Sequence, residues 1–186
     1  TGGMNIAIGV YALGANTTGN SNIAVGCGSL AANTTASYNT AVGSSALKAN
    51  TTGGHNVALG ADALGNNTTA ADNTAIGSSA LYDNTTGACN VAVGRQSLAN
   101  NTTAGANTAV GKGAMYGNTT GGSNAAFGYK ALCSNTTGAS NTGFGDSTLR
   151  TTSTGTWNVA VGKNALFSNT TASYNTAVGA CTLFAN

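Results

Sequence analysis

The residue types that most often carry out catalysis are few in this 186-residue chain and are scattered along it. There is one histidine, His55, and the acidic residues are Asp62, Asp72, Asp83 and Asp146. Lyases and hydrolases built on parallel β-coils need clustered carboxylates, and acyltransferases of related shape need a histidine base. Calcium-binding repeats would carry an aspartate in every repeat. The sequence therefore predicts no enzyme, no metal site and no cofactor.

Asn-Thr-Thr triplets are the residues whose types and spacing best match a chemical modification. Each triplet is a formal Asn-x-Thr acceptor for an N-linked sugar. The candidate glycosylation sites are Asn16, Asn33, Asn50, Asn67, Asn84, Asn101, Asn118, Asn135 and Asn169. A sugar on the adjacent threonines is a related possibility. The alternative is structural, because Asn and Thr in turns satisfy backbone groups with their side chains and can form ladders with their copies.

The triplets recur because the whole chain, residues 1–186, is a single array of 17-residue repeats without insertion or deletion. Repeats begin at Asn5, Asn22, Asn39, Asn56, Asn73, Asn90, Asn107, Asn124, Asn141, Asn158 and Asn175. A fixed short period is typical of a solenoid, in which each repeat contacts only its neighbours. The partial repeats at both ends lead us to expect a segment of a longer fibre.

Positions within a repeat are numbered here from 1 at the recurring Asn to 17. Position 4 is always apolar, position 5 is always Gly, and position 9 is Leu or, once, Met115. We predict one strand at positions 2–4, a bend at the glycine, a second strand at positions 7–10 and a return turn at Asn-Thr-Thr-Gly. A glycine in every repeat and the absence of helical apolar spacing exclude helix. The expected fold is all-β, a parallel β-solenoid or β-roll of about eleven rungs with a rise of ~4.8 Å each.

Stacking of the rungs places equivalent side chains in columns. We expect Val or Ile at position 4 and Leu at position 9 to form a narrow apolar spine, and Asn at position 1 to form an amide ladder. The variable positions 6, 7, 10, 11, 16 and 17 should face solvent. Such a thin core predicts lateral packing against other copies, preferably as a three-fold bundle, and the unpaired end strands predict head-to-tail stacking.

Composition excludes several other classes of protein. Charged residues are 5% of the chain, against roughly 25% in typical soluble domains. Six scattered Lys and Arg residues form no basic stripe, so nucleic acid is not an expected partner. No run reaches the ~18 apolar residues of a membrane helix, so no membrane insertion is expected. The four cysteines occupy different columns, which predicts free thiols or links to another chain.

The repeated Asn-Thr-Ala-Val-Gly followed by Ala-Leu, as in residues 39–47, resembles the head repeats of trimeric autotransporter adhesins. Residues 39–52 are also similar to segments of phage tail fibres and other extracellular fibre proteins. The resemblance implies a left-handed parallel β-roll in a trimer, located on a cell surface, in a secreted fibre or on a virion. The expected function is a stiff structural rod. Ice binding through stacked threonine columns is the alternative.

Overall fold

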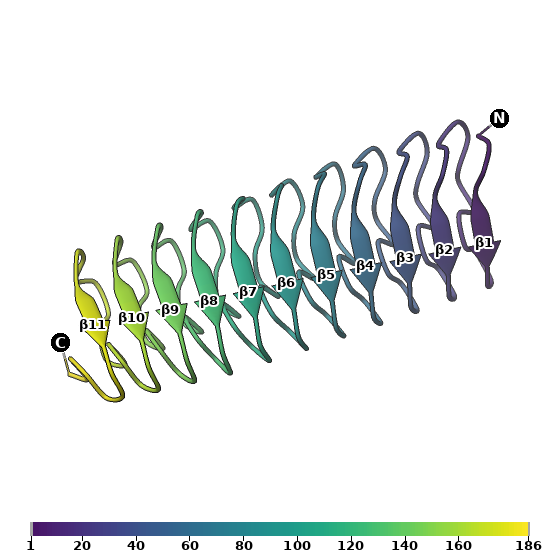
Figure 1. The fold of residues 1–186 in the computed structure, drawn as a ribbon. Helices are drawn as coiled ribbons and strands as arrows, with labels where there is room; N and C mark the ends of the chain where they lie inside the picture. Colours follow the sequence, from purple (N-terminus) through teal and green to yellow (C-terminus); the bar gives the residue numbers. More distant parts are fainter. Residues whose placement is uncertain (1, 186) are drawn as a thin grey trace.

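The computed structural model describes residues 2–185 and shows one straight rod of stacked coils, with the two ends of the chain at opposite ends of the rod (Figure 1). Each coil contributes one three-residue strand: β1 (Ile6–Ile8), β2 (Ile23–Val25), β3 (Thr40–Val42), β4 (Val57–Leu59), β5 (Thr74–Ile76), β6 (Val91–Val93), β7 (Thr108–Val110), β8 (Ala125–Phe127), β9 (Thr142–Phe144), β10 (Val159–Val161) and β11 (Thr176–Val178). The strands form a single parallel sheet in chain order. No helix in the described residues is long and apolar enough to cross a membrane.

The predicted β-solenoid is confirmed, and so is the strand at positions 2–4. Neighbouring strands pair with a constant offset of one repeat, so that Ala41 lies opposite Ala58. Equivalent residues therefore stack directly above one another, as the fixed period requires. The sheet runs along one side of the rod, and the remainder of each coil returns behind it through turns (Figure 1).

The interior of the rod is filled by small residues and leucines. Ala58 on the strand, Ala63 at position 8 and Leu64 at position 9 all have no exposed surface. The position-9 column is therefore the apolar spine that the sequence predicted. The prediction that position 4 belongs to the spine was wrong, because Leu59 is 46% exposed and Ile76 36% exposed. Side chains alternate across a strand, so positions 2 and 4 point outward when the alanine at position 3 points inward. The interior of a 17-residue coil has room for that alanine but not for the larger side chains of position 4.

The second strand predicted at positions 7–10 is absent from the described coils, and this stretch forms turns instead. Ser45 and Leu47 have φ values of 57° and 51°. These values belong to the left-handed region, which is incompatible with an extended strand. Hydrogen bonding between coils nevertheless continues, since the N–H of Leu47 donates to the carbonyl of Ala63 at 3.0 Å. The turns close the coil tightly enough to bring Leu47 into the core.

The bend predicted at the position-5 glycine is confirmed. The glycines in this column have φ values between 123° and 140°, which L-residues with a side chain rarely adopt. A Cβ atom on Gly60 would lie 2.7 Å from the carbonyl carbon of Gly77 in the next coil. The glycine column therefore satisfies two requirements together, the bend itself and the close approach of successive backbones.

Candidate functional site

The asparagines predicted as sugar acceptors lie inside the rod. Eight of the nine have no exposed surface, and Asn16, near the N-terminal end, is half-buried. The amide nitrogen of Asn50 donates to the side-chain oxygen of Asn33 at 3.2 Å and to the carbonyl of Gly53 at 2.9 Å. Both amide hydrogens are thus engaged. An N-linked sugar replaces one of these hydrogens, so the packed coil has no free amide nitrogen at Asn50.

The asparagines of the Asn-Thr-Thr triplets, at position 12, form one ladder along the rod. The position-1 asparagines form a second ladder, as the sequence predicted. The backbone N–H of Asn39 donates to the side-chain oxygen of Asn22 at 3.0 Å, and the Asn39 amide donates to the Gly53 carbonyl at 2.9 Å. That carbonyl is also the acceptor for Asn50. The position-15 carbonyl therefore joins the two ladders and ties the return turn to the start of the strand. Sequence analysis did not identify this role, although position 15 is always Gly or Ala.

The two adjacent threonine columns have different environments. The hydroxyl of Thr51, at position 13, donates to the carbonyl of Thr68 at 3.1 Å and is half-buried. Within residues 2–185 the position-14 threonines are exposed: Thr18, Thr35, Thr52, Thr69, Thr86, Thr103, Thr120, Thr137, Thr154 and Thr171. They form an uninterrupted column along the rod. This column repeats the same chemical group at the surface of every complete coil.

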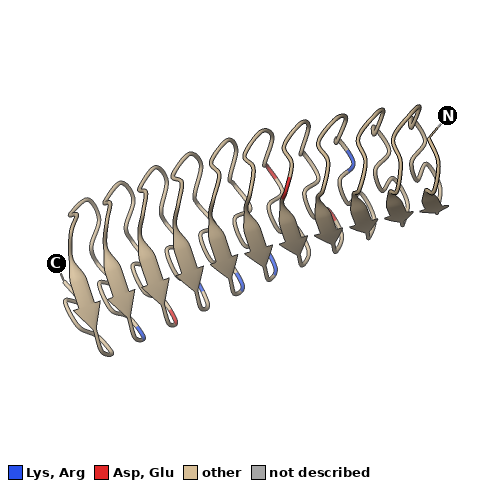
Figure 2. Ribbon diagram, turned by 45° about the horizontal axis from the view of Figure 1, so that its top comes forward, with Lys and Arg blue, Asp and Glu red and all other residues tan. Residues whose placement is uncertain are grey.

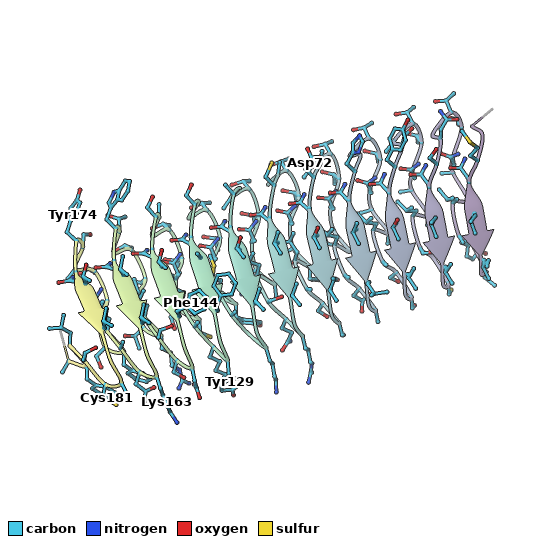
Figure 3. All side chains as sticks on the ribbon, viewed as in Figure 1. Asp72, Tyr129, Phe144, Lys163, Tyr174 and Cys181 are labelled. Carbon is cyan, nitrogen blue, oxygen red and sulfur yellow. The ribbon has the colours of Figure 1, made fainter. Side chains whose placement is uncertain are left out.

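The outward face of the parallel sheet is uncharged along its whole length. Positions 2 and 4 project from it and hold only Thr, Ala, Val, Ile, Leu and Phe. Phe127 and Phe144 stack on this face with ring centroids 4.4 Å apart, and Figure 3 shows Phe144 in front of its strand. We define the outward side chains of β1 to β11 as the sheet face. In β2 to β11 the position-3 residue, nearly always alanine, lies on the opposite, buried side of the strand.

The residues capable of acid–base chemistry remain apart. Asp62 and Asp72 belong to one coil, at positions 7 and 17, and Asp83 and Asp146 belong to two others. The ring of His55 stacks on Tyr38 with centroids 4.9 Å apart. Within residues 2–185, no three His, Cys, Asp or Glu side chains lie together as potential metal ligands. Charged side chains are dispersed over the surface, with most of the Lys and Arg residues in the C-terminal half (Figure 2).

The four cysteines are free thiols in the structure, on different columns and coils. Cys27, Cys89 and Cys181 are exposed, and Cys133 is partly buried. Burial raises the pKa of the Cys133 thiol, and the nearby Lys130 and Arg150 lower it only in part. Because the thiolate is the reactive form, Cys133 is a weak nucleophile at neutral pH.

The rod therefore has two regular exposed features, the sheet face and the position-14 threonine column. Comparison with known proteins found no relative of the chain. No protein-family model, no curated protein and no solved structure matches the chain.

Proposed function

We propose that this chain is a structural segment of an extracellular fibre or adhesin, a stiff rod that assembles with copies of itself. The observation that carries the proposal is the uncharged sheet face, which continues without a break over eleven strands. Position 4 contributes an apolar side chain in every strand, and the largest apolar surface of a protein is often a site of interaction. Its location outside the cell, on a cell surface, in a secreted fibre or on a virion, is proposed from the resemblance of the repeats.

The dimensions of the sheet face suit a second copy of the chain. Ten steps of ~4.8 Å give a length of about 50 Å, and a strand of three residues adds a width of about 10 Å. Two such faces would bury roughly 1,000 Å² in total, which is near the lower limit for a specific interface. A second copy also has the same repeat along the rod, so its side chains stay in register with the first. A three-fold bundle, the arrangement implied by the adhesin resemblance, would place three such faces around one axis.

Stacking along the axis is the second part of the proposal. Within this chain the strands are ordered from β1 to β11 in one sheet, and a further copy could extend that order. Neighbouring internal coils share the same backbone hydrogen bonds at positions 2, 5, 7, 9 and 17. A contact between the last coil of one chain and the first coil of another would be heterologous, and contacts of that type generate filaments rather than closed rings. Covering the edges in this way also removes sites of uncontrolled pairing.

Sedimentation and light scattering of the purified chain test the lateral part of the proposal. The wild type is expected to form a discrete oligomer. The double variant Ile76→Lys and Val110→Lys, which places two charges on the sheet face, is expected to be monomeric with an unchanged circular dichroism spectrum. Ser78→Lys adds a charge at an exposed position outside the strand and should leave the oligomer intact. A wild type that stays monomeric at high concentration would refute lateral assembly.

Ice binding is a second candidate, favoured by the position-14 threonine column. Ten exposed threonines at a constant spacing could order water in a repeating pattern. The sheet face is less suited to this task, because Phe127 and Phe144 interrupt its row of smaller side chains. A thermal-hysteresis assay separates the two functions. Activity that is lost in Thr86→Tyr would establish ice binding, whereas absence of hysteresis leaves the fibre function.

A further inference from the structure

A groove crosses the three coils that begin at Asn90, Asn107 and Asn124. It has a volume of about 240 Å³ and is lined by Gln96, Lys112, Gly113, Tyr116, Lys130 and Cys133. These residues come from positions 6, 7 and 10, away from the strands. The groove is therefore separate from the sheet face and independent of the proposed assembly.

Gly113 lines the groove and has no side chain at position 7, where most coils carry one. Gly113 has a φ of 65°, close to the values of Ser79 and Lys130 in the same column. A Cβ atom placed on Gly113 would have Lys130 Cγ as its nearest neighbour, at 3.6 Å. The site could thus accept a side chain without a clash, and its absence leaves space between the flanking residues.

Positive charge gathers around the groove without a matching acid. The three coils contain Arg95, Lys112 and Lys130 and no acidic residue. The backbone N–H of Lys130 donates to the carbonyl of Lys112 at 3.1 Å, so these two lysines lie on adjacent coils. In the following coil, Asp146 accepts a hydrogen bond from Ser147 at 2.7 Å. Like charges on neighbouring strands or coils repel, and an anion between them would relieve that repulsion.

The other lining groups suit a hydroxylated ring better than a bare ion. The ring of Tyr116 is 39% exposed and offers an apolar surface beside the lysines. Gln96 contributes an amide that can both donate and accept hydrogen bonds. Sites for small molecules typically combine an apolar wall with a few polar groups that fix orientation. We propose that this groove binds a sugar ring that carries a carboxylate or sulfate group, with Lys112 and Lys130 at the anion, Tyr116 against the ring and Gln96 at its hydroxyls.

A second groove on the rod provides a comparison. It is larger, about 330 Å³, and its lining includes Lys48, Asp62, Asn66 and Tyr82. Its charges are of both signs, and the amide of Asn66 already donates to Asp83 at 3.0 Å. The ring of Tyr82 lies close over Gly65, so that a Cβ atom on this glycine would be 2.8 Å from it. The larger groove therefore contains its own opposite charges and an amide that is already hydrogen-bonded. It serves as an internal control for the smaller groove.

The test is a two-dimensional NMR titration of the ¹⁵N-labelled chain with glucuronic acid, glucose 6-sulfate, glucose and inorganic sulfate. We expect saturable shifts of the Gly113, Gln96 and Lys130 amides with at least one of the two acidic sugars. Binding of glucose and of inorganic sulfate should be weaker by about tenfold or more. The two acidic sugars together show whether carboxylate or sulfate is preferred.

Two variants separate a built site from general charge attraction. Lys112→Gln should weaken binding about tenfold. Gly113→Ser introduces a residue that is common at position 7 and fills part of the groove without changing its charge. This variant should abolish the saturable shifts. Lys48→Gln, in the larger groove, should leave them unchanged. Equal shifts with inorganic sulfate and acidic sugars, or full binding by Gly113→Ser, would overturn the proposal, as would the absence of saturable shifts in the wild type.

Discussion

The side-chain oxygen of Asn135 is buried without a hydrogen-bond donor, and the residue above it in the column is Thr152. One coil earlier, the equivalent oxygen of Asn118 accepts a hydrogen bond from the Asn135 amide at 2.7 Å. Thr152 has no amide to continue the ladder, and its hydroxyl donates to the carbonyl of Asn169 at 3.0 Å instead. The position-12 ladder is therefore interrupted between these two coils.

Restoring the ladder should stabilise the rod. Thr152→Asn supplies an amide that can donate to the Asn135 oxygen, and a buried unsatisfied acceptor costs about 1–3 kcal/mol. Part of this gain is offset by loss of the Thr152 hydroxyl bond, so we expect the free energy of unfolding to rise by about 1 kcal/mol. Urea denaturation measures it. Thr154→Asn, at an exposed position, is the control, and a less stable Thr152→Asn chain would contradict this account of the interruption.

N-linked sugar is expected to be absent from the folded rod at the fully buried asparagines. Attachment at Asn50 or Asn118 would remove a hydrogen bond of the ladder and place a large polar group in a closed interior. Glycopeptide mapping of the natural material checks this. Hexose mass at Asn50 in chains that retain the solenoid would disprove it, and sugar confined to the exposed threonines would agree with it.

Gly60→Ala should destabilise the coil severely. The backbone strain at a φ of 136° costs about 1–3 kcal/mol. In addition, the new Cβ atom would meet the backbone of Gly77, which cannot move without displacing the next coil. Thermal unfolding followed by circular dichroism measures the loss. Gly54→Ala is the matched control, because Ala71 and Ala88 occupy the same column, and equal melting temperatures for the two variants would contradict the prediction.

Gly143 and Thr148 form a pair whose sizes compensate within one coil. A Cβ atom on Gly143 would lie 2.9 Å from the Thr148 hydroxyl and 2.5 Å from a methyl of Leu132. Overpacking of this kind typically costs about 1–3 kcal/mol, so Gly143→Ala alone should lower stability by that amount.

The double variant Gly143→Ala with Thr148→Ala should recover most of this loss. It reproduces the Ala109 and Ala114 pair of the coil that begins at Asn107, where both residues are fully buried. Urea unfolding of the wild type, both single variants and the double variant gives the coupling energy. Additive effects of the two substitutions would show that the residues do not compensate each other.

Cys133 should be alkylated last of the four cysteines. Its thiol is partly buried and its pKa is raised, so the thiolate fraction at pH 8 is smaller than for an ordinary thiol and grows only at higher pH. Mass spectrometry after timed iodoacetamide treatment should show Cys27, Cys89 and Cys181 modified first. In concentrated guanidinium chloride the four rates should converge. A Cys133 that reacts at the rate of Cys27 in the folded chain would contradict the burial.

The sequence predicted those features that depend on the repeat period alone. A 17-residue translation stacks equivalent residues, which was enough to identify the strand at residues 40–42, the bend at Gly43, the buried Leu47 and the asparagine ladders. It could not decide which side of the strand faces inward, because Ala41 and Val42 are both apolar. The space inside the closed coil decides this, and it admits the smaller residue.

The turns at positions 7–10 were missed for a different reason. Ser45 and Leu47 adopt left-handed backbone conformations that their residue types do not favour. Hydrogen bonds to the neighbouring coils hold them there, and a single repeat contains no sign of that constraint. The groove around Gly113 was missed because it depends on side chains from three coils. The number of chains in a bundle and the presence of sugars depend on contacts beyond one chain, so both stay predictions.

The constant offset of 17 residues between paired strands makes the rod a one-dimensional lattice. Removing one whole repeat, for example residues 56–72, deletes a single lattice translation, and the two coils that then meet have compatible columns at every position. Removing one residue instead shifts every later column out of phase. Length in such a molecule can therefore change by recombination between repeats, in steps of ~4.8 Å, while the cross-section and the chemistry of each face stay the same.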